Sequence, residues 1–351
     1  MNEPSPAAPT STVAEREDFY ERLAPHHMAP LWEVLKNIMT REPVSAALPC
    51  HWRYQDVRPL LLESGGLLSA EEAERRVLVL ENPSFIGQTK ATSSLYAGIQ
   101  LVMPGETAPS HRHTPSALRF VLEGEGGFTA VGGERTTMRP GDFITTPAWA
   151  WHDHGNEGDG PVAWLDGLDI PMAQFFETIF MQPGEELRQA LHRPEGESLA
   201  RFGQGLLPMD DRARYGKTSP VFNYPYSRTR AALLECAKAE RPDPHLAVTL
   251  RYANPEDGGW AMPTMSTWMT HVPNGFETTP MRSTESLVLA VAEGSCEVQI
   301  GEQTFVVETS DVVAVPGWTW RAFRATSDCN LFFFSDRVVH EKLGFFREER
   351  G

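Results

Sequence analysis

Gly105-Glu-Thr-Ala-Pro-Ser-His111-Arg-His113 carries two histidines in a segment of β-type composition, and Gly141-Asp-Phe-Ile-Thr-Thr-Pro147-Ala-Trp-Ala-Trp-His152 supplies a third. Residues i and i+2 of a strand point to the same face of a sheet, so His111 and His113 can reach one point while Arg112 faces away. His152 from a neighbouring strand would complete a set of three imidazoles. Neutral imidazole suits Fe, Zn, Cu and Ni. A three-ligand site with open positions is suited to chemistry, so the pattern predicts a catalytic metal centre in a β fold.

The composition limits the class of protein. A chain of 351 residues is long enough for two domains or two fused barrels. A net charge of -16 argues against a nucleic-acid partner, because phosphate binding needs a basic face. No apolar run approaches the length of a membrane span, and the four scattered cysteines are typical of reduced thiols. We therefore expect a cytoplasmic protein with no membrane partner.

Hydrophobic periodicity divides the chain into segments. Helical spacing runs from about Val13 to Thr40, with five candidate buried positions: Phe19, Leu23, Leu31, Leu35 and Ile38. Ser69 and Glu72 form a capping-box pattern that predicts a short helix through Glu74, Arg75 and Arg76. Short β-type runs separated by turn residues follow from Val77 to about Leu168 and again from about Pro263 to Asp336. Helical spacing returns from Pro171 to His192, and the sequence from Arg193 to Pro244 is Pro/Gly-rich.

The two β-rich regions are repeats of each other. Six residues of the first recur 170 positions later and four more recur 169 later. The pairs are Gly105/Gly275, Arg112/Arg282, Thr114/Thr284, Ser116/Ser286, Glu123/Glu293, Gly124/Gly294, Asp142/Asp311, Pro147/Pro316, Trp149/Trp318 and Trp151/Trp320. Ten identities in order predict two copies of one barrel.

The second copy lacks all three histidines. Met281, Ser283 and Arg321 stand where the first copy has His111, His113 and His152. The repeated scaffold therefore does not require imidazole at these positions, which favours a functional role for the three histidines.

The motif from Gly105 to His113 and the motif from Gly141 through His152 to Asn156 resemble the two conserved blocks of the cupin superfamily. The sequence around Arg119, and that around His152-Asp-His154-Gly-Asn156, resembles the bicupin ring-cleaving dioxygenases of the gentisate 1,2-dioxygenase and salicylate 1,2-dioxygenase family. The resemblance covers roughly residues 15 to 345. Many cupins add a glutamate ligand after the second histidine, but Thr114-Pro-Ser-Ala-Leu118 offers none here, as in this family.

The resemblance implies a mainly β fold of two tandem double-stranded β-helix (jelly-roll) barrels with N-terminal and linking helices. We expect a disordered tail at 1–14, a helical segment at 15–76 and a first barrel with the metal site at 77–170. A linker with helices is expected at 171–262 and a second barrel without metal ligands at 263–340. The family also implies one Fe(II) per subunit and a homotetramer.

The implied activity is cleavage of an aromatic ring by O2 between the carboxyl-bearing carbon and the adjacent hydroxyl-bearing carbon. Gentisate is the leading substrate, and salicylate, 5-substituted salicylates and 1-hydroxy-2-naphthoate are alternatives. A carboxylate ortho to a phenol can chelate the metal and leave a position for O2. More distant alternatives are a non-oxidative cupin isomerase or decarboxylase and an effector-binding cupin.

Further residues are assigned around the triad. Arg119 has the strand parity of His113 and the chemistry to bind a carboxylate, while its counterpart in the second copy is Leu289. His154 shares the strand face of His152 and is the candidate for proton transfer or a hydrogen bond to the phenolate.

Weaker assignments complete the expected site. Arg75 is a second substrate-binding candidate, although the adjacent Arg76 competes for the inward position. Tyr96 and Gly98 alternate along a strand and are expected on the pocket wall, and glycine in a strand often permits close approach of a ligand. Asp166 is expected to hold a histidine or an arginine from behind.

Overall fold

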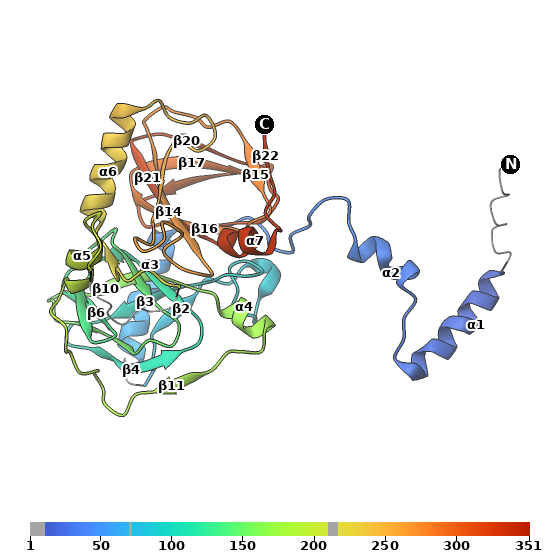
Figure 1. Cartoon of the computed structure of the whole chain (residues 1–351), viewed down its shortest axis with the longest axis horizontal. Helices are drawn as coiled ribbons and strands as arrows, with labels where there is room; N and C mark the ends of the chain where they lie inside the picture. Colours follow the sequence, from blue (N-terminus) through green and yellow to red (C-terminus); the bar gives the residue numbers. More distant parts are fainter. Residues whose placement is uncertain (1–10, 70–71, 210–216) are drawn as a thin grey trace. The chain divides into compact units, whose positions relative to one another are not determined.

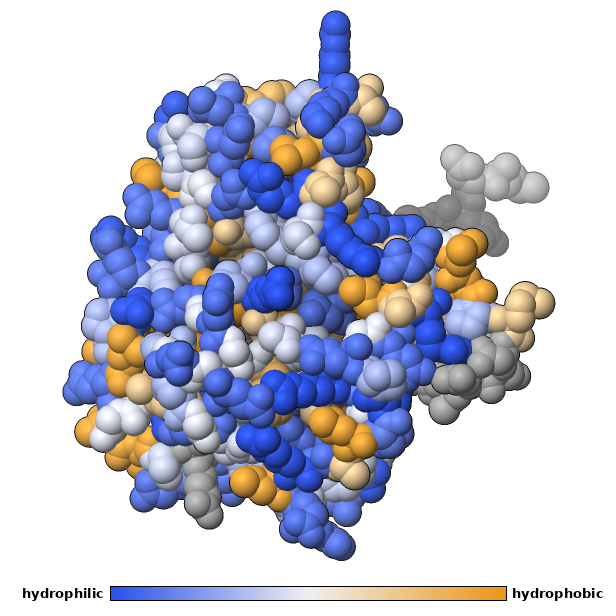
Figure 2. Space-filling model, turned by 90° about the vertical axis from the view of Figure 1, so that its left-hand side faces the viewer, coloured by the Kyte–Doolittle hydropathy of each residue, from blue (hydrophilic) through white to orange (hydrophobic). Residues whose placement is uncertain are grey.

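The computed structural model describes residues 11–69, 72–209 and 217–351. The chain divides into two compact units, residues 1–44 and 45–351. Within the described ranges, no helix combines the length and apolarity that crossing a membrane would require. On the face shown in Figure 2, polar and charged residues dominate and hydrophobic residues form separate small patches.

The first unit contains two helices, α1 (Val13–Leu23) and α2 (Leu31–Ile38). Thr12 and Glu15 form a capping box at the start of α1, which places the helix start inside the expected tail, while residues 1–10 of that tail lie outside the described residues. The predicted burial of Phe19, Leu31, Leu35 and Ile38 is wrong, because all four are exposed, and Leu23 is half-buried. Two short helices offer too little apolar surface to enclose a core.

The second unit consists of two stacked β-barrels flanked by helices (Figure 1). The first barrel is built from β2 (Val77–Val79), β3 (Tyr96–Val102), β4 (Thr107–His113), β5 (Ala117–Glu123), β6 (Gly127–Val131), β7 (Glu134–Thr137), β8 (Phe143–Thr146), β9 (His152–Asn156), β10 (Val162–Leu168), β11 (Met181–Pro183) and β12 (Asn223–Tyr224). These strands form two antiparallel sheets, in the orders β12-β8-β5-β10-β3-β2 and β11-β4-β9-β6-β7.

The second barrel repeats this arrangement. Its strands are β1 (Cys50–Trp52), β13 (Val248–Arg251), β14 (Ser266–Val272), β15 (Met281–Ser283), β16 (Leu287–Glu293), β17 (Ser295–Ile300), β18 (Gln303–Glu308), β19 (Val312–Val315), β20 (Arg321–Ala325), β21 (Cys329–Ser335) and β22 (Glu348–Arg350). The sheet orders are β1-β19-β16-β21-β14-β13 and β18-β17-β20-β15-β22. The strand β1 precedes the first barrel in the sequence but pairs with β19 of the second barrel. The strand β12 lies in the sequence between the two barrels and pairs with β8 of the first barrel.

Helices connect and cover the barrels. They are α3 (Tyr54–Leu67), α4 (Ile170–Phe175), α5 (Glu197–Phe202), α6 (Tyr226–Ala239) and α7 (Arg337–Leu343). A 3-10 turn at Pro83–Phe85 also lies in this unit, whereas the 3-10 turn at Ala24–His26 belongs to the first unit. The helices α3 and α6 occupy equivalent places in the repeat: the N–H of Tyr54 donates to Asp311, and the N–H of Tyr226 donates to Asp142. The two-fold repeat therefore extends beyond the ten identities to the helices that join the barrels.

Two helix predictions are wrong. Ser69 and Glu72 make the reciprocal hydrogen bonds of a capping box, yet the residues from 72 to 76 form turns and bends, with Glu74 at φ 52°. The helical spacing from Pro171 to His192 yields only α4, because the chain then leaves the helix and adds β11 alongside β4. In both places tertiary contacts override the local pattern.

One hydrophobic cluster spans both barrels. Phe120 of the first barrel stacks on Phe332 of the second with ring centroids 4.4 Å apart and an interplanar angle of 6°. Phe143 lies against the same ring at 5.4 Å. The two barrels therefore share a hydrophobic core, and the second barrel packs directly against the first.

Candidate metal centre

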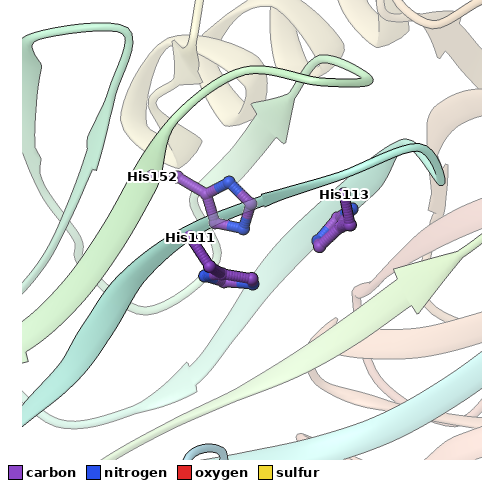
Figure 3. Close-up of side chains that lie close together, drawn as sticks. All are labelled: His111, His113 and His152. Atoms are coloured by element: carbon purple, nitrogen blue, oxygen red, sulfur yellow. The ribbon is translucent and has the colours of Figure 1, made fainter. Parts of the chain in front are cut away.

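Three histidines converge inside the first barrel (Figure 3). His111 and His113 come from β4 and His152 comes from β9, and their ligand nitrogens all lie within 4.8 Å of one another. The strand pairing places His111 directly opposite His152. The alternation of side chains along β4 thus brings two ligands to one face and the neighbouring strand brings the third.

Two of the rings are oriented by backbone carbonyls. Nδ1 of His113 donates to the carbonyl of Pro115 at 2.7 Å, and Nδ1 of His152 donates to the carbonyl of Ala150 at 2.9 Å. These bonds leave Nε2 of each ring as the lone-pair atom, which is the arrangement typical of metal-ligating histidines. Among the described residues, the buried Nε2 of His152 has no hydrogen-bond partner.

The environment keeps the imidazoles neutral. Burial is the largest cause and, with the positive charge of Arg75, lowers the pKa of His111 to about 2. Burial likewise lowers the pKa of His113 to about 4 and holds the pKa of His152 well below its ordinary value. Neutral imidazole is the form that binds a metal ion, so at neutral pH all three rings are ready to act as ligands.

A pocket of about 240 Å³ adjoins the three histidines. Its walls come from the segment that precedes β2 and from β2, β3, β4, β5, β9, β10, α4 and β11. The lining residues are Arg75, Val77, Tyr96, Gln100, His111, His113, Ala117, Arg119, His152, His154, Asp166, Leu168, Ile170 and Met181. Larger cavities lie elsewhere, including one of about 610 Å³ beside Arg58 and Asp311, but among the described residues the only group of side chains that could hold a metal ion lies at the 240 Å³ pocket.

Arg119 is buried and held on three sides. Its Nη1 donates to the hydroxyl of Thr146 at 2.6 Å, its Nη2 donates to Nε2 of His154 at 2.9 Å, and its Nε lies 3.6 Å from Asp166. A guanidinium carries five N–H donors, and these two hydrogen bonds leave three of them free for another acceptor. Burial is the largest influence on Asp166 and raises its pKa to about 6, against the opposing effect of Arg119.

His154 lies behind the triad, with its ring centroid 5.6 Å from that of His152. Because Arg119 can only donate, Nε2 of His154 accepts, and its Nδ1 then donates to the hydroxyl of Thr129 at 2.8 Å. Burial and the charges of Arg119 and Arg75 hold the pKa of His154 well below its ordinary value. The ring is therefore neutral, and the pocket's positive charge resides on the two arginines.

The structure separates the two adjacent arginines near β2. Arg75 reaches into the pocket, where it contacts His111 and donates to the carbonyl of Pro109 at 2.6 Å. Arg76 turns away and makes a paired contact with Glu106, at 2.6 and 2.7 Å. Burial lowers the pKa of Arg75 to about 10, so it still carries its charge at neutral pH.

Tyr96 lines the pocket, but Gly98 does not. A Cβ atom at Gly98 would lie 2.7 Å from the hydroxyl of Tyr96 and 2.6 Å from Val77. These two side chains fill the space beside the glycine, and Gly98 is not among the residues that line the pocket. The glycine instead lets the ring of Tyr96 lie across the strand.

Sequence reasoning missed Gln100 and Met181. Gln100 follows Tyr96 on the same face of β3, and its buried Nε2 lacks a hydrogen-bond partner among the described residues. The parity used for Tyr96 would have identified it. Met181 enters through β11, in a segment predicted to be helical, and no local signal indicated it.

The sequence of this chain is similar to those of known proteins. A cupin domain model matches residues 98–168. The chain is 48% identical to gentisate 1,2 dioxygenase 1 of Aquipseudomonas alcaligenes over 97% of this chain and 98% of that protein. It is 32% identical to 5-aminosalicylate 1,2-dioxygenase of Comamonas sp over 97% and 92% of the two chains.

A solved structure also matches over nearly the whole chain. It is salicylate 1,2-dioxygenase from Pseudoaminobacter salicylatoxidans with gentisate, which superimposes with a TM-score of 0.89 and 32% identity over 98% of this chain and 96% of that one. The two-barrel fold, the three convergent histidines and the similarity to these relatives all indicate the same family. This chain belongs to the bicupin ring-cleaving dioxygenases of the gentisate 1,2-dioxygenase and salicylate 1,2-dioxygenase family.

Proposed function

We propose that this chain holds one Fe(II) at His111, His113 and His152 and cleaves gentisate between its carboxyl-bearing carbon and the adjacent hydroxyl-bearing carbon. The observation that carries the proposal is the set of three neutral imidazoles in a pocket that also contains the buried Arg119 and the half-buried Arg75. Imidazole ligands suit iron, and among the described residues no thiol or carboxylate completes the cluster. The partnerless Nε2 of buried His152 is explained by a metal ligand role.

Iron bound there would supply coordination sites for an ortho-hydroxy carboxylate and for O2, together with the redox chemistry that activates O2. The protein's own contribution is binding and orientation. The three donors that Arg119 has left are suited to the substrate carboxylate, and its contacts with Thr146 and His154 fix the direction in which they point. Arg75 provides a second positive charge on the same side of the pocket.

His154 is proposed to exchange the hydrogen bond that its Nε2 accepts from Arg119 for one from the substrate hydroxyl, or to move that proton, and its lowered pKa keeps the ring neutral for that task. Asp166 is proposed to hold Arg119 in place through the ion pair with its Nε. Tyr96, positioned by Gly98, is proposed to contact the ring substituent opposite the phenol. Gln100 adds a buried amide donor for a polar substituent.

The direct test is a substrate panel with Fe(II)-loaded protein: gentisate, salicylate, 5-aminosalicylate, other 5-substituted salicylates and 1-hydroxy-2-naphthoate. Product absorbance and O2 uptake are followed in air and under anaerobic conditions. The proposal requires O2-dependent turnover, with gentisate the best substrate. Turnover without O2 would indicate an isomerase or decarboxylase, and binding without turnover would indicate an effector-binding cupin.

We also propose a cytoplasmic homotetramer. The four cysteines are all free thiols, as expected for a reducing compartment. The segment from α4 to β11 exposes five large apolar side chains, which would be covered in an oligomer: Phe175, Phe176, Ile179, Phe180 and Met181. Light scattering should give the mass of four chains, and a monomeric mass would contradict the proposal.

A further inference from the structure

The outer face of the metal-bearing sheet carries a stacked arginine. The guanidinium of Arg112 lies over the rings of Trp149 and Trp151, with its carbon 4.5 and 4.7 Å from the two ring centroids. We call these three residues the arginine clamp. Arg112 stands between the ligands His111 and His113 and points to the opposite face, while Trp149 and Trp151 immediately precede the ligand His152. The clamp therefore joins the two segments that carry the ligands.

The pairing of β4 with β9 does not extend to all three ligands, although β11 pairs with β4 at His113. The pairing of β4 with β9 has a register shift between Ala108 and His111, and its last pair is His111 with His152. The strand β9 begins at His152, so His113 has no residue of β9 opposite it. Some other contact must fix the position of His113 relative to His152.

The turn that carries Trp149 provides this contact. The N–H of Trp149 donates to the carbonyl of His113 at 2.8 Å, and the carbonyl of Ala150 accepts from the ring of His152 at 2.9 Å. Trp149 adopts φ 62°, a conformation that a bulky residue rarely occupies and that persists only where its surroundings enforce it. The stacked guanidinium of Arg112 and the ring of Phe180, whose centroid lies 4.5 Å from that of Trp149, are the contacts that hold the indole in place.

The edge of the Arg112 guanidinium is anchored by hydrogen bonds as well. Its Nε and Nη2 donate to the side-chain oxygen of Gln182 in β11, at 2.9 and 2.6 Å. A flat guanidinium can stack on aromatic faces and donate from its edge at the same time, whereas an ammonium cannot. Position 112 therefore suits arginine specifically.

The second barrel contains the same clamp without the metal ligands. Arg282 lies over Trp318 and Trp320 at 4.5 and 4.9 Å, and Trp318 adopts φ 57°. The N–H of Trp318 donates to the carbonyl of Ser283 at 2.6 Å. This sister clamp shapes the scaffold only, so it provides a matched control inside the same chain.

We infer that Arg112 is a positioning residue for the metal centre: by clamping Trp149 and Trp151 it sets the distance between His113 and His152 and so determines how tightly the metal binds. This inference rests on the proposed metal site. Outer contacts that orient metal ligands change metal affinity by about 10- to 100-fold when they are removed. Arg112 touches neither metal nor substrate, and it acts only through the turn at Trp149.

The test is a titration of the full-length, chelator-treated protein with Co(II), which is followed by the visible absorption of the bound ion. The variants are Arg112→Met, the milder Arg112→Lys and the control Arg282→Met. Arg112→Met should weaken Co(II) binding by about 10-fold or more and alter the absorption spectrum. Arg112→Lys should give a smaller loss, because the charge stays and the flat stacking surface goes. Arg282→Met should lower the melting temperature and leave Co(II) affinity unchanged.

Unchanged Co(II) affinity in a folded Arg112 variant would overturn the inference. Equal losses in Arg112→Met and Arg282→Met would also overturn it, since the clamp would then act only on general stability. If Arg112→Met does not fold, the affinity of Arg112→Lys decides. Failure of the unaltered protein to bind Co(II) would refute the proposed metal site itself, and the inference with it.

Discussion

Arg119 shows how a single buried side chain prepares the site for a substrate. It is held by Thr146, His154 and Asp166, and it retains free donors directed by those contacts. Parity along one extended strand predicted that it faces the site, but β4 ends at His113 and Arg119 lies on β5 of the other sheet, so the two residues meet in the pocket from different sheets. The hydrogen bonds that orient it come from β8 and β9 and the ion pair from β10, and these partners could not be predicted without the fold.

Changing Arg119 to Lys should separate substrate binding from metal binding. The charge survives but the fork of donors is lost, and a hydrogen bond to a charged group contributes about 1.5–3 kcal/mol, so the KM for gentisate should rise about 10- to 100-fold. Iron content should not change. Steady-state kinetics and metal analysis check this.

Arg321→Lys is the matched control for Arg119→Lys. Arg321 is a buried arginine of the second barrel, 3.4 Å from Glu285. Its replacement should leave the KM unaltered. A rise in KM with this control, or loss of iron in Arg119→Lys, would contradict the assigned role.

The depressed pKa of His113 has a consequence for stability. The unfolded chain protonates this histidine below pH 6.5, whereas the folded protein, with a pKa of about 4, does not. The unfolded state then binds more protons, so the folded apo-protein loses stability as the pH falls through this window. Between pH 6.5 and 5 the loss is about 1.5 kcal/mol for this one group.

His113→Gln removes this dependence. The difference in free energy of unfolding between the apo-variant and the apo-wild type should shift by that amount in favour of the variant between pH 6.5 and 5. Denaturant unfolding at both pH values measures it. Parallel pH profiles for the two proteins would show that the ring is not held neutral by burial.

At the level of elements, the strands of the two predicted β-rich regions were predictable, whereas the connections and the added strands β1, β11, β12, β13 and β22 were not. Runs of β-type sequence from Val77 to Leu168 coincide with β2 through β10, because alternation and turn residues are local signals. The helix α6 was hidden within a segment described as Pro/Gly-rich connecting sequence. Its equivalence to α3 was nevertheless encoded, since Tyr54 and Arg58 recur as Tyr226 and Arg230.

The strand β3 offers a test of how the pocket wall is built. A methyl group at Gly98 would meet the hydroxyl of Tyr96 and Val77 at distances too short for van der Waals contact. In Gly98→Ala, the Tyr96 ring should move toward the pocket and reduce its volume. The kcat/KM for 1-hydroxy-2-naphthoate should then fall more than that for gentisate, which is smaller. Equal losses for both substrates would contradict this account of Gly98.

On the scale of the whole molecule, the second barrel has lost the ligands and kept the packing. Phe332 of that barrel stacks on Phe120 and contacts Phe143 of the first. The repeat predicted two barrels, but a repeat cannot reveal that they share one core. That requires knowing which faces meet.

The shared core predicts that the first barrel does not fold alone. A fragment of residues 45–262 would expose the face that Phe332 covers and should show no cooperative thermal transition by circular dichroism. A chain lacking residues 1–44 is the control, because it retains both barrels and should melt cooperatively. A cooperative transition in the shorter fragment would show that the barrels are independent.

The account depends most on a metal ion at the three histidines of the first barrel. The direct measurement is anomalous diffraction at the iron edge from crystals of the Fe(II)-loaded protein grown with gentisate. We predict one iron per chain among His111, His113 and His152, with gentisate beside it and its carboxylate toward Arg119. Iron at another place, or gentisate bound away from these histidines, would contradict the account.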